Sequence, residues 1–360
     1  MSPKGIALYL PQFHPIPEND EWWGKGFTEW TNTAKAIPLY RNHYQPHLPA
    51  DLGFYDLRVP ETRIRQAELA REYGIEGFCY YHYWFGGKRI LERPFNEMLN
   101  SGQPDFPFCV CWANETWTGI WHNAPNKILI EQVYPGEDDH RSHFNTLLPA
   151  FKDKRYLKIE EKPIFIIYRP ENLPEIKATV ELWRKFAKME GLPGLYLIGM
   201  SGFDWNPSEN GFDAKVVYPF LRGRQWISRR NILSWSKQQL KIWRGTPTIL
   251  DYRKVIIKYE KDLKDNIEKS GIDSPIYPCV IHSFDNTPRS GKNGVLYKYA
   301  TPESFRIHLR GAVKAISDYP DSHQLIFLKS WNEWAEGNHL EPDQKYGHEF
   351  LKVVKDELKR

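Results

Sequence analysis

Residues 77–84 read Gly-Phe-Cys-Tyr-Tyr-His-Tyr-Trp, an unbroken apolar and aromatic run. A run of this length and composition indicates a strand that is buried on both faces. Seven more runs of the same kind occur along the chain. The eight predicted strands are 5–10, 77–84, 107–112, 163–168, 195–200, 214–218, 276–282 and 325–330.

Amphipathic helical patterns lie between most of these strands, and several begin with Pro or an acidic residue, as helices commonly do. They cover 60–73, 89–100, 138–151, 174–190, 251–270, 302–319 and 346–358. Only the link from the fifth strand to the sixth lacks a clear helix. Because eight strand–helix units account for 360 residues without a second domain, we predict an α/β fold, a single (β/α)8 barrel over 1–360. We expect long loops at its C-terminal face and an insertion around residues 220–250.

Composition narrows the classes of function. Aromatic residues make up 15% of the chain, with 14 Trp and 20 Tyr, which fits either a Trp-rich core or platforms for sugar rings. A net charge of +4 is too small to indicate nucleic-acid binding. Nucleotide, phosphate and zinc-protease motifs are missing, so we predict neither a cofactor nor a metal site. The cysteines fall inside predicted strands and are interpreted as reduced core thiols: Cys79, Cys109, Cys111 and Cys279.

A basic segment separates the sixth and seventh strands. No acidic residue lies between Asp213 and Asp251, whereas eight Lys and Arg residues do, with three Trp among them. This segment fits a solvated helical arm, or a peripheral contact of residues 222–244 with a membrane or a lipid-linked glycan. The N-terminal residues carry no apolar signal segment, so we expect a cytoplasmic protein, or a periplasmic one if a leader has been removed. The sequence does not indicate an oligomeric state.

In a barrel of this kind, catalytic and binding groups follow the carboxyl ends of the strands. Polar and aromatic residues gather at those positions. The predicted substrate-binding residues are His14, Trp30, Tyr81, Tyr83, Trp112, Asn114, Glu115, Trp117, Tyr168, Arg169, His282, Asp285, Trp331, Asn332 and Trp334. Alternatives stay open for several of them. His14 and His282 could equally be buried core residues whose ring nitrogens are hydrogen-bonded within the protein. Asp285 could cap a loop. Arg169 could neutralise an acidic sugar or hold Glu333.

The segment 331–337, Trp-Asn-Glu-Trp-Ala-Glu-Gly, follows the eighth strand. Glycosyl transfer requires one carboxyl group that protonates the leaving oxygen and a second that acts as base, nucleophile or charge stabiliser. Glu333 and Glu336 supply such a pair, and neighbouring indole rings could raise a carboxyl pKa by excluding water. We therefore predict that these two residues are catalytic. Glu115 is the alternative catalytic carboxylate.

Four stretches resemble the WbsX-like group, which is related to the family 99 glycoside hydrolases that include endo-α-mannosidases. They are 9–15 (Tyr-Leu-Pro-Gln-Phe-His-Pro), 22–30 (Trp-Trp-Gly-Lys-Gly-Phe-Thr-Glu-Trp), 77–85 and 112–115. The resemblance covers essentially the whole chain. It implies that Glu336 acts as general acid and then base, while Glu333 deprotonates the sugar 2-hydroxyl to give a 1,2-anhydro intermediate, with overall retention. It departs at Ala335, where the mannosidases typically have His, so it implies the carboxylate roles and leaves the sugar undetermined.

Three functions follow as hypotheses. The first is a retaining glycoside hydrolase or transglycosylase that acts on a bacterial surface polysaccharide or its precursor. The second is a nucleotide-sugar glycosyltransferase of O-antigen or lipopolysaccharide biosynthesis, against which the missing Asp-x-Asp pattern counts. The third is a non-catalytic glycan-binding protein. In each case we expect an oligosaccharide or polysaccharide as the partner.

Overall fold

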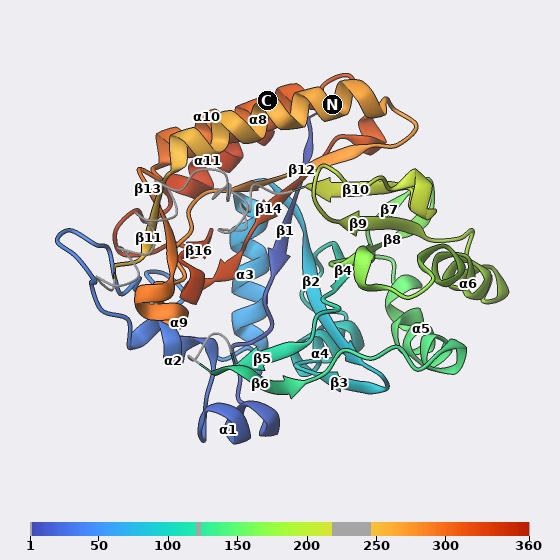
Figure 1. Cartoon of the computed structure of the whole chain (residues 1–360), viewed down its shortest axis with the longest axis horizontal. Helices are drawn as coiled ribbons and strands as arrows, with labels where there is room; N and C mark the ends of the chain where they lie inside the picture. The colour runs from blue at the N-terminus through green and yellow to red at the C-terminus, as the bar shows by residue number, and fades with distance from the viewer. Residues whose placement is uncertain (1, 120–123, 218–245, 360) are drawn as a thin grey trace.

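A computed structural model describes residues 2–119, 124–217 and 246–359. Eight parallel strands form a closed barrel in which their spatial order follows their order in the chain, and β1 closes the ring by pairing with both β2 and β14 (Figure 1). The eight strands are β1 (Lys4–Tyr9), β2 (Ile75–Phe85), β4 (Phe108–Trp112), β8 (Lys162–Ile167), β9 (Tyr196–Met200), β10 (Ala214–Val217), β12 (Ile276–Ile281) and β14 (Leu325–Lys329). All eight predicted strands are confirmed within one or two residues at each end, apart from Tyr218, which lies outside the described residues.

Within the described residues, seven long helices pack outside the barrel, and the sequence predicted each of them. They are α3 (Pro60–Glu72), α4 (Arg93–Ser101), α5 (Glu137–Phe151), α6 (Ile176–Met189), α8 (Tyr252–Ser270), α10 (Pro302–Ala315) and α11 (Glu349–Leu358). Between β9 and β10 the chain forms only the short 3-10 turn η3 (Ser208–Asn210), as expected.

Two predicted helix starts were too early by three or more residues. Residues 88–90 form β3 (Lys88–Ile90), which pairs with β2, and Leu91 has a φ of 59°, so the helix begins only at Arg93 beside Pro94. Near the C-terminus, Gly347 has a φ of 51°, and α11 begins at Glu349 rather than at residue 346. The helix predicted over 302–319 also ends earlier, at Ala315. At both helix starts a residue with positive φ interrupts the helical backbone despite the helical pattern.

Long connections lie at the carboxyl ends of the strands, as predicted. The segment after β1 holds α1 (Pro17–Trp23) and α2 (Glu29–Ala34). The hairpin β5 (Trp117–Gly119) and β6 (Ala124–Ile130) follows β4. After β12 come α9 (Thr287–Ser290), η4 (Gly291–Asn293) and β13 (Val295–Lys298), which pairs with β11 (Thr248–Asp251). Most of the predicted insertion, up to residue 245, lies outside the described residues. The short element η2 (Pro170–Asn172) follows the carboxyl end of β8, whereas β7 (Lys158–Ile159) and η5 (Asp321–His323) precede β8 and β14 at the amino ends of the strands.

One extensive apolar core joins the barrel interior to the helices, and all four cysteines are buried in it as free thiols, as predicted. Alternation along β2 sorts its side chains between the two sides of the barrel wall. His82 and Trp84 contact His143 of α5 on the outside, whereas Tyr81 and Tyr83 face the barrel opening. Tyr81 and Tyr83, near the carboxyl end of β2, are therefore placed where a ligand could reach them.

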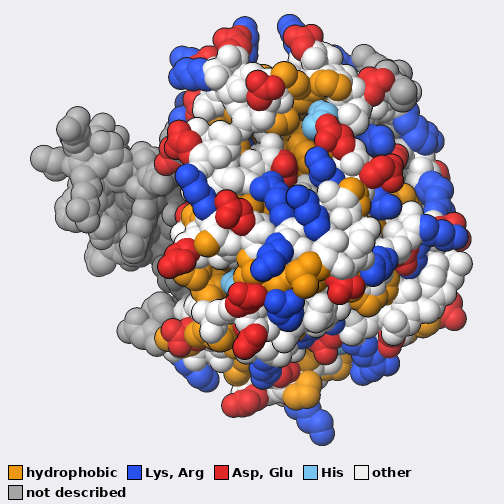
Figure 2. Space-filling view, turned by 90° about the vertical axis from the view of Figure 1, so that its right-hand side faces the viewer, with side chains coloured by type: hydrophobic (Ala, Val, Ile, Leu, Met, Phe, Trp, Pro, Cys, Tyr) orange, Lys and Arg blue, Asp and Glu red, His pale blue; other side chains and the backbone are white. Residues whose placement is uncertain are grey.

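The molecular surface around α5 and α6 mixes acidic and basic side chains without a large patch of one sign (Figure 2). Among the described residues, no helix combines the length and apolar character that a bilayer crossing requires.

Candidate active site

A cavity of about 430 Å³ opens at the carboxyl ends of the barrel strands. Aromatic rings and carboxyl groups share its lining. The lining residues are Leu10, Gln12, Trp23, Phe27, Glu29, Asn32, Tyr81, Tyr83, Ala113, Glu115, Thr116, Trp117, Thr118, Leu129, Tyr168, Arg169, Arg289, Lys329, Glu333 and Glu336. Flat apolar rings beside charged hydrogen-bonding groups complement the C–H faces and hydroxyl groups of sugars.

Glu333 and Glu336 lie side by side on one short loop that begins at the end of β14. The loop comprises β15 (Asn332–Glu333), the 3-10 turn η6 (Trp334–Glu336) and β16 (Asn338–His339), which pairs back onto β15. Gly337 has a φ of 54° and provides the reversal between η6 and β16. The loop is therefore a compact hairpin that presents both carboxyl groups to the cavity.

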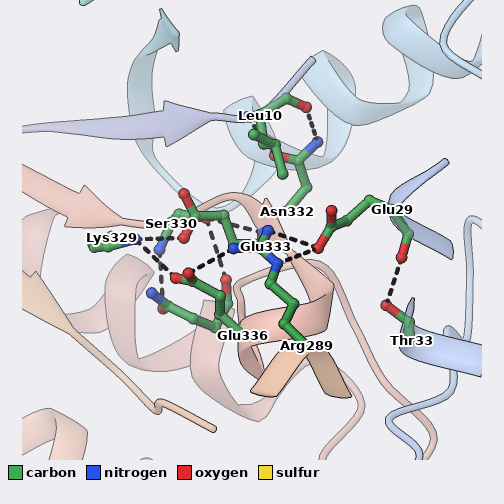
Figure 3. Close-up of polar contacts among 10 residues, drawn as sticks. Leu10, Glu29, Thr33, Arg289, Lys329, Ser330, Asn332, Glu333 and Glu336 are labelled. Atoms are coloured by element: carbon green, nitrogen blue, oxygen red, sulfur yellow. Dashed lines mark hydrogen bonds and ion pairs between the residues drawn. The ribbon is translucent and has the colours of Figure 1, made fainter. Parts of the chain in front are cut away.

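Asn332 ties this loop to the first strand. Its Oδ1 accepts a hydrogen bond from the Leu10 backbone N–H at 2.8 Å, and its Nδ2 donates to the Leu10 carbonyl at 3.0 Å (Figure 3). The Trp331 backbone N–H also donates to the Leu8 carbonyl at 2.8 Å. Because β1 belongs to the rigid barrel, these contacts fix the position of Glu333.

Two cations contact the paired carboxyl groups (Figure 3). Lys329 Nζ contacts Glu333 Oε2 and lies 3.3 Å from Glu336 Oε2. Arg289 Nη1 donates to Glu336 Oε1 at 2.6 Å, and its Nη2 lies 2.6 Å from Glu29 Oε1. Arg289 therefore bridges the loop that carries Glu336 to α2, and Lys329 bridges the two glutamates.

The pKa values of Glu333 and Glu336 are shifted in opposite directions. Burial raises the pKa of Glu333 to about 8; the charge of Glu336 adds to this effect, and Lys329 opposes it. Burial acts in the same direction on Glu336, but Lys329 and Arg289 outweigh it and lower its pKa to about 2. The two carboxyl groups also hydrogen-bond each other, so they titrate as a pair that shares one proton at neutral pH. A carboxyl pair that retains one proton is suited to acid–base catalysis.

Six predicted substrate-binding residues line the cavity with this pair: Tyr81, Tyr83, Glu115, Trp117, Tyr168 and Arg169. The Trp117 ring packs edge-on against the Tyr83 ring at 5.0 Å. On the other side, Arg169 Nε donates to Glu115 Oε1 at 2.8 Å, and the guanidinium group lies 4.7 Å from the centre of the Tyr168 ring. Arg169 pairs with Glu115, whereas Glu333 has Lys329 as its cationic partner.

The other nine predicted substrate-binding residues lie outside the cavity lining: His14, Trp30, Trp112, Asn114, His282, Asp285, Trp331, Asn332 and Trp334. All nine are buried. Asn114, for example, exchanges two hydrogen bonds of 2.8 Å with the Arg169 backbone, and Trp334 Nε1 donates to Glu341 Oε2 at 2.6 Å. Asp285 receives side-chain hydrogen bonds from His43 and Gln45, and its backbone N–H donates to the Glu336 carbonyl. These side chains hold the loops that form the site.

Sequence reasoning overlooked three charged residues of the site. Lys329 ends an otherwise apolar strand, and a lone lysine in a buried run was a detectable signal. Arg289 and Glu29 offered no such signal, because they are 260 positions apart and meet only in the folded barrel. Ala335, where the resemblance departs from the mannosidases, is fully buried and lies outside the cavity lining.

This chain matches known sequences along nearly its whole length. A sequence profile of the family described as "Glycosyltransferase WbsX" matches residues 5–354. The uncharacterised proteins WxcX from two strains of Xanthomonas campestris pv. campestris are 38% and 37% identical to this chain over 357 residues. Each match covers 99% of this chain and 49% of the relative, so the chain spans about half the length of these curated relatives.

Solved structures share the fold at low sequence identity. A glycoside hydrolase-like protein superposes with a TM-score of 0.63 at 14% identity, over 99% of this chain and 94% of its own. The GH99 endo-α-mannosidase from Bacteroides thetaiotaomicron gives a TM-score of 0.59 at 12% identity, over 99% of this chain and 96% of its own. At these identities the likeness concerns the barrel architecture alone.

Proposed function

Since this chain belongs to the WbsX glycosyltransferase family, a group of carbohydrate-active proteins with a barrel like that of GH99, we propose that it is a retaining glycoside hydrolase or transglycosylase. One observation carries the proposal. Two buried glutamates contact one lysine inside an aromatic-lined cavity at the carboxyl end of the barrel. As substrate we propose a bacterial surface polysaccharide or its precursor.

In the proposed first step, Glu333 takes the proton of the sugar 2-hydroxyl as O2 attacks the anomeric carbon. Glu336 donates a proton to the glycosidic oxygen, whose bond to the anomeric carbon breaks. In the second step, Glu336 takes a proton from water as the water oxygen opens the 1,2-anhydro ring at the anomeric carbon, and Glu333 returns its proton to O2. A sugar hydroxyl in place of water gives transglycosylation. Two inversions at the same carbon give overall retention.

This route requires one proton on the glutamate pair, and the site electrostatics support that net state at neutral pH. The free site favours that proton on Glu333, because Lys329 and Arg289 both stabilise the ionised form of Glu336. The first step requires the proton on Glu336 instead. Because the carboxyl groups hydrogen-bond each other, transfer within the pair reaches the reactive arrangement without exchange with solvent.

The charge of the described lining supports a neutral sugar at the reacting position. Four carboxyl groups, of Glu29, Glu115, Glu333 and Glu336, face three cations, of Arg169, Arg289 and Lys329. One shared proton makes this set neutral. Sugars of mannose or rhamnose configuration fit the route, because their axial 2-hydroxyl is well placed to attack the anomeric carbon.

The alternative of a nucleotide-sugar glycosyltransferase rests on the family description. In the described lining, each of the three cations pairs with a carboxylate of the same cavity, so positive charge for a pyrophosphate would have to come from elsewhere. Calorimetric binding of a sugar nucleotide, together with glycosyl transfer from it, would favour this alternative.

The test is incubation with a panel of defined oligosaccharides, with the product anomers followed by NMR. We expect products of retained configuration, and inverted products would contradict the anhydro-sugar route. Glu333→Gln and Glu336→Gln should each lower kcat by at least about 10³-fold, because each removes one proton-transfer step.

Glu115→Gln is the matched control. Glu115 also lines the cavity, but its side chain is 44% exposed and pairs with Arg169, so we expect a much smaller effect on kcat. If Glu115→Gln alone abolished activity, the assignment of catalysis to Glu333 and Glu336 would be wrong. Unchanged glycan affinity in all three variants, with no turnover by the wild type on any glycan, would favour a non-catalytic binding protein.

A further inference from the structure

A second cluster of titratable side chains lies beside the catalytic loop and outside the cavity. It consists of His47, His339 and Asp343, all buried, whose ligating atoms lie within 4.8 Å of one another. His47 belongs to the long connection after β1, His339 ends β16, and Asp343 precedes α11. Neither the proposed reaction nor the family resemblance uses these residues.

The two imidazoles face each other through ring nitrogens. His47 Nδ1 and His339 Nε2 are 2.9 Å apart. The other nitrogen of His339, Nδ1, lies 2.9 Å from the Glu341 carbonyl and must donate to it, so the lone pair of neutral His339 is on Nε2. Burial lowers the pKa of both histidines. A lone pair of neutral imidazole is thus directed at the space beside His47.

Asp343 is oriented by its own hydrogen bonds. Its Oδ1 accepts from the backbone N–H groups of Lys345 at 3.0 Å and Tyr346 at 2.6 Å, and its Oδ2 accepts from the Tyr44 hydroxyl at 3.1 Å. Metal-binding carboxylates and histidines are typically held in this way, with the second imidazole nitrogen donating to a carbonyl or carboxylate. The cluster therefore has both the donor atoms of a metal site and the outer contacts that orient them.

We propose that His47, His339 and Asp343 bind one divalent transition-metal ion of the zinc type. Imidazole nitrogen and carboxylate oxygen suit such an ion. At Zn–N distances of about 2.0–2.1 Å, nitrogens 2.9 Å apart subtend an angle of about 90° at the ion. Ligand atoms in a tetrahedral zinc site are about 3.3–3.4 Å apart, so a separation of 4.8 Å in the cluster would close by about 1.5 Å, shared between the side chains, on metal binding. Water would complete the coordination.

The ion would stabilise the loops around the site and would take no part in the reaction. It would join the segment around His47 to β16 and to the chain that leads into α11. β16 pairs with β15, which carries Glu333, and the His339 ring stacks on Trp334 at 3.7 Å. Metal binding here would brace the hairpin that presents the two glutamates. This inference is independent of the proposed reaction.

The experiment uses the intact chain, treated with a chelator, dialysed, and titrated with Zn²⁺ alone by calorimetry, with thermal unfolding followed in parallel. We expect one Zn²⁺ per chain and a Tm that rises with its concentration, because a ligand of the folded state stabilises it. His47→Phe and Asp343→Asn should each weaken Zn²⁺ binding by at least about 10-fold. Asp343→Asn keeps the oxygen that accepts from the backbone, so it preserves the fold if His47→Phe does not.

His348→Phe is the control, because His348 pairs with a carboxylate, Asp51, outside the cluster. It should bind Zn²⁺ as tightly as the wild type. The proposal is overturned if the wild type binds no stoichiometric Zn²⁺, which would leave a simple hydrogen bond between His47 and His339. It is also overturned if folded Asp343→Asn and His348→Phe bind Zn²⁺ with equal affinity.

Discussion

Lys329 shows how much one side chain determines in this site. Its ammonium group lies against the carboxyl groups of Glu333 and Glu336 in a buried position, where a cation stabilises a carboxylate far more than it does in water. Arg289 reinforces this effect on Glu336 alone, because its other partner is Glu29. The asymmetry between the two glutamates therefore arises from which cations each one contacts.

Lys329→Met should move the acidic limb of the kcat/KM pH profile upward by about 1–3 pH units, because loss of the cation raises the pKa of both carboxyl groups. In the wild type, activity should hold at neutral pH, fall as pH rises through about 8, where the pair loses its proton, and fall in acid as pH approaches about 2. The pH dependence of hydrolysis of the substrate identified in the oligosaccharide panel measures both limbs.

The matched control is Lys215→Met. Lys215 is also a buried lysine on a barrel strand, but it donates to the carbonyls of Phe203 and Trp205 and lies outside the cavity lining. This variant should lose stability and keep the wild-type pH limbs. An acidic limb that moves equally in both variants would mean that Lys329 does not set the pKa of the pair.

At the scale of the element, the hairpin 332–339 depends on one turn. Gly337 adopts a φ of 54°, which disfavours residues with a Cβ atom, and a Cβ there would lie 3.0 Å from Asp285 Cβ and 3.2 Å from His47 Cε1. The turn is therefore restricted both by its backbone conformation and by its neighbours. Its position fixes where Glu336 meets Arg289.

Gly337→Ala should destabilise the protein by about 1–2 kcal/mol through the left-handed conformation and should also lower kcat, because the added methyl group displaces the hairpin. Gly102→Ala isolates the backbone effect, since Gly102 has a φ of 69° and its Cβ would meet no atom within 4 Å. Chemical denaturation and kinetics on both variants separate the two effects. Equal activity in both variants would show that the crowding at Gly337 does not reach the site.

At the scale of the whole molecule, the two ends of the described chain meet. β1 begins beside the end of α11 (Figure 1). The Leu358 side chain packs over Gly5 there. Glu357 of α11 is buried. Its Oε1 accepts hydrogen bonds from Arg306 Nη1 at 2.9 Å and from Arg310 Nη2 at 2.8 Å, both on α10, and these distances are typical of charge-assisted bonds. Helices α10 and α11 thus secure the closure between the last strand and the first.

Glu357→Gln should lower the free energy of unfolding by about 1–2 kcal/mol; the value is modest because both arginines are partly exposed to water. Glu349→Gln on the same helix is the control, because its pair with Lys352 is exposed at both ends, and its effect should be close to zero. Urea unfolding of the two variants measures the difference. Equal stability of the two variants would show that the Glu357 contacts do not stabilise the closed barrel.

The sequence alone determined the strands, the long helices and the position of segment 331–337 after the eighth strand. Burial on both faces leaves a continuous apolar run in a parallel strand, so the eight strands were readable without neighbours. The barrel then required polar residues such as Tyr83 and Glu333 to meet at one rim.

Only the tertiary structure decided which rim residues face the cavity and which support it. Trp112 ends the strand that Asn114 and Glu115 follow, yet Trp112 and Asn114 are buried away from the cavity, because side chains alternate and loops turn back onto the wall. The charges that set the glutamate pKa values depend on contacts between distant segments, as between Arg289 and Glu29. Local pattern reports the burial of each residue along the chain, whereas the chemistry of the site depends on distances that exist only once the barrel has closed.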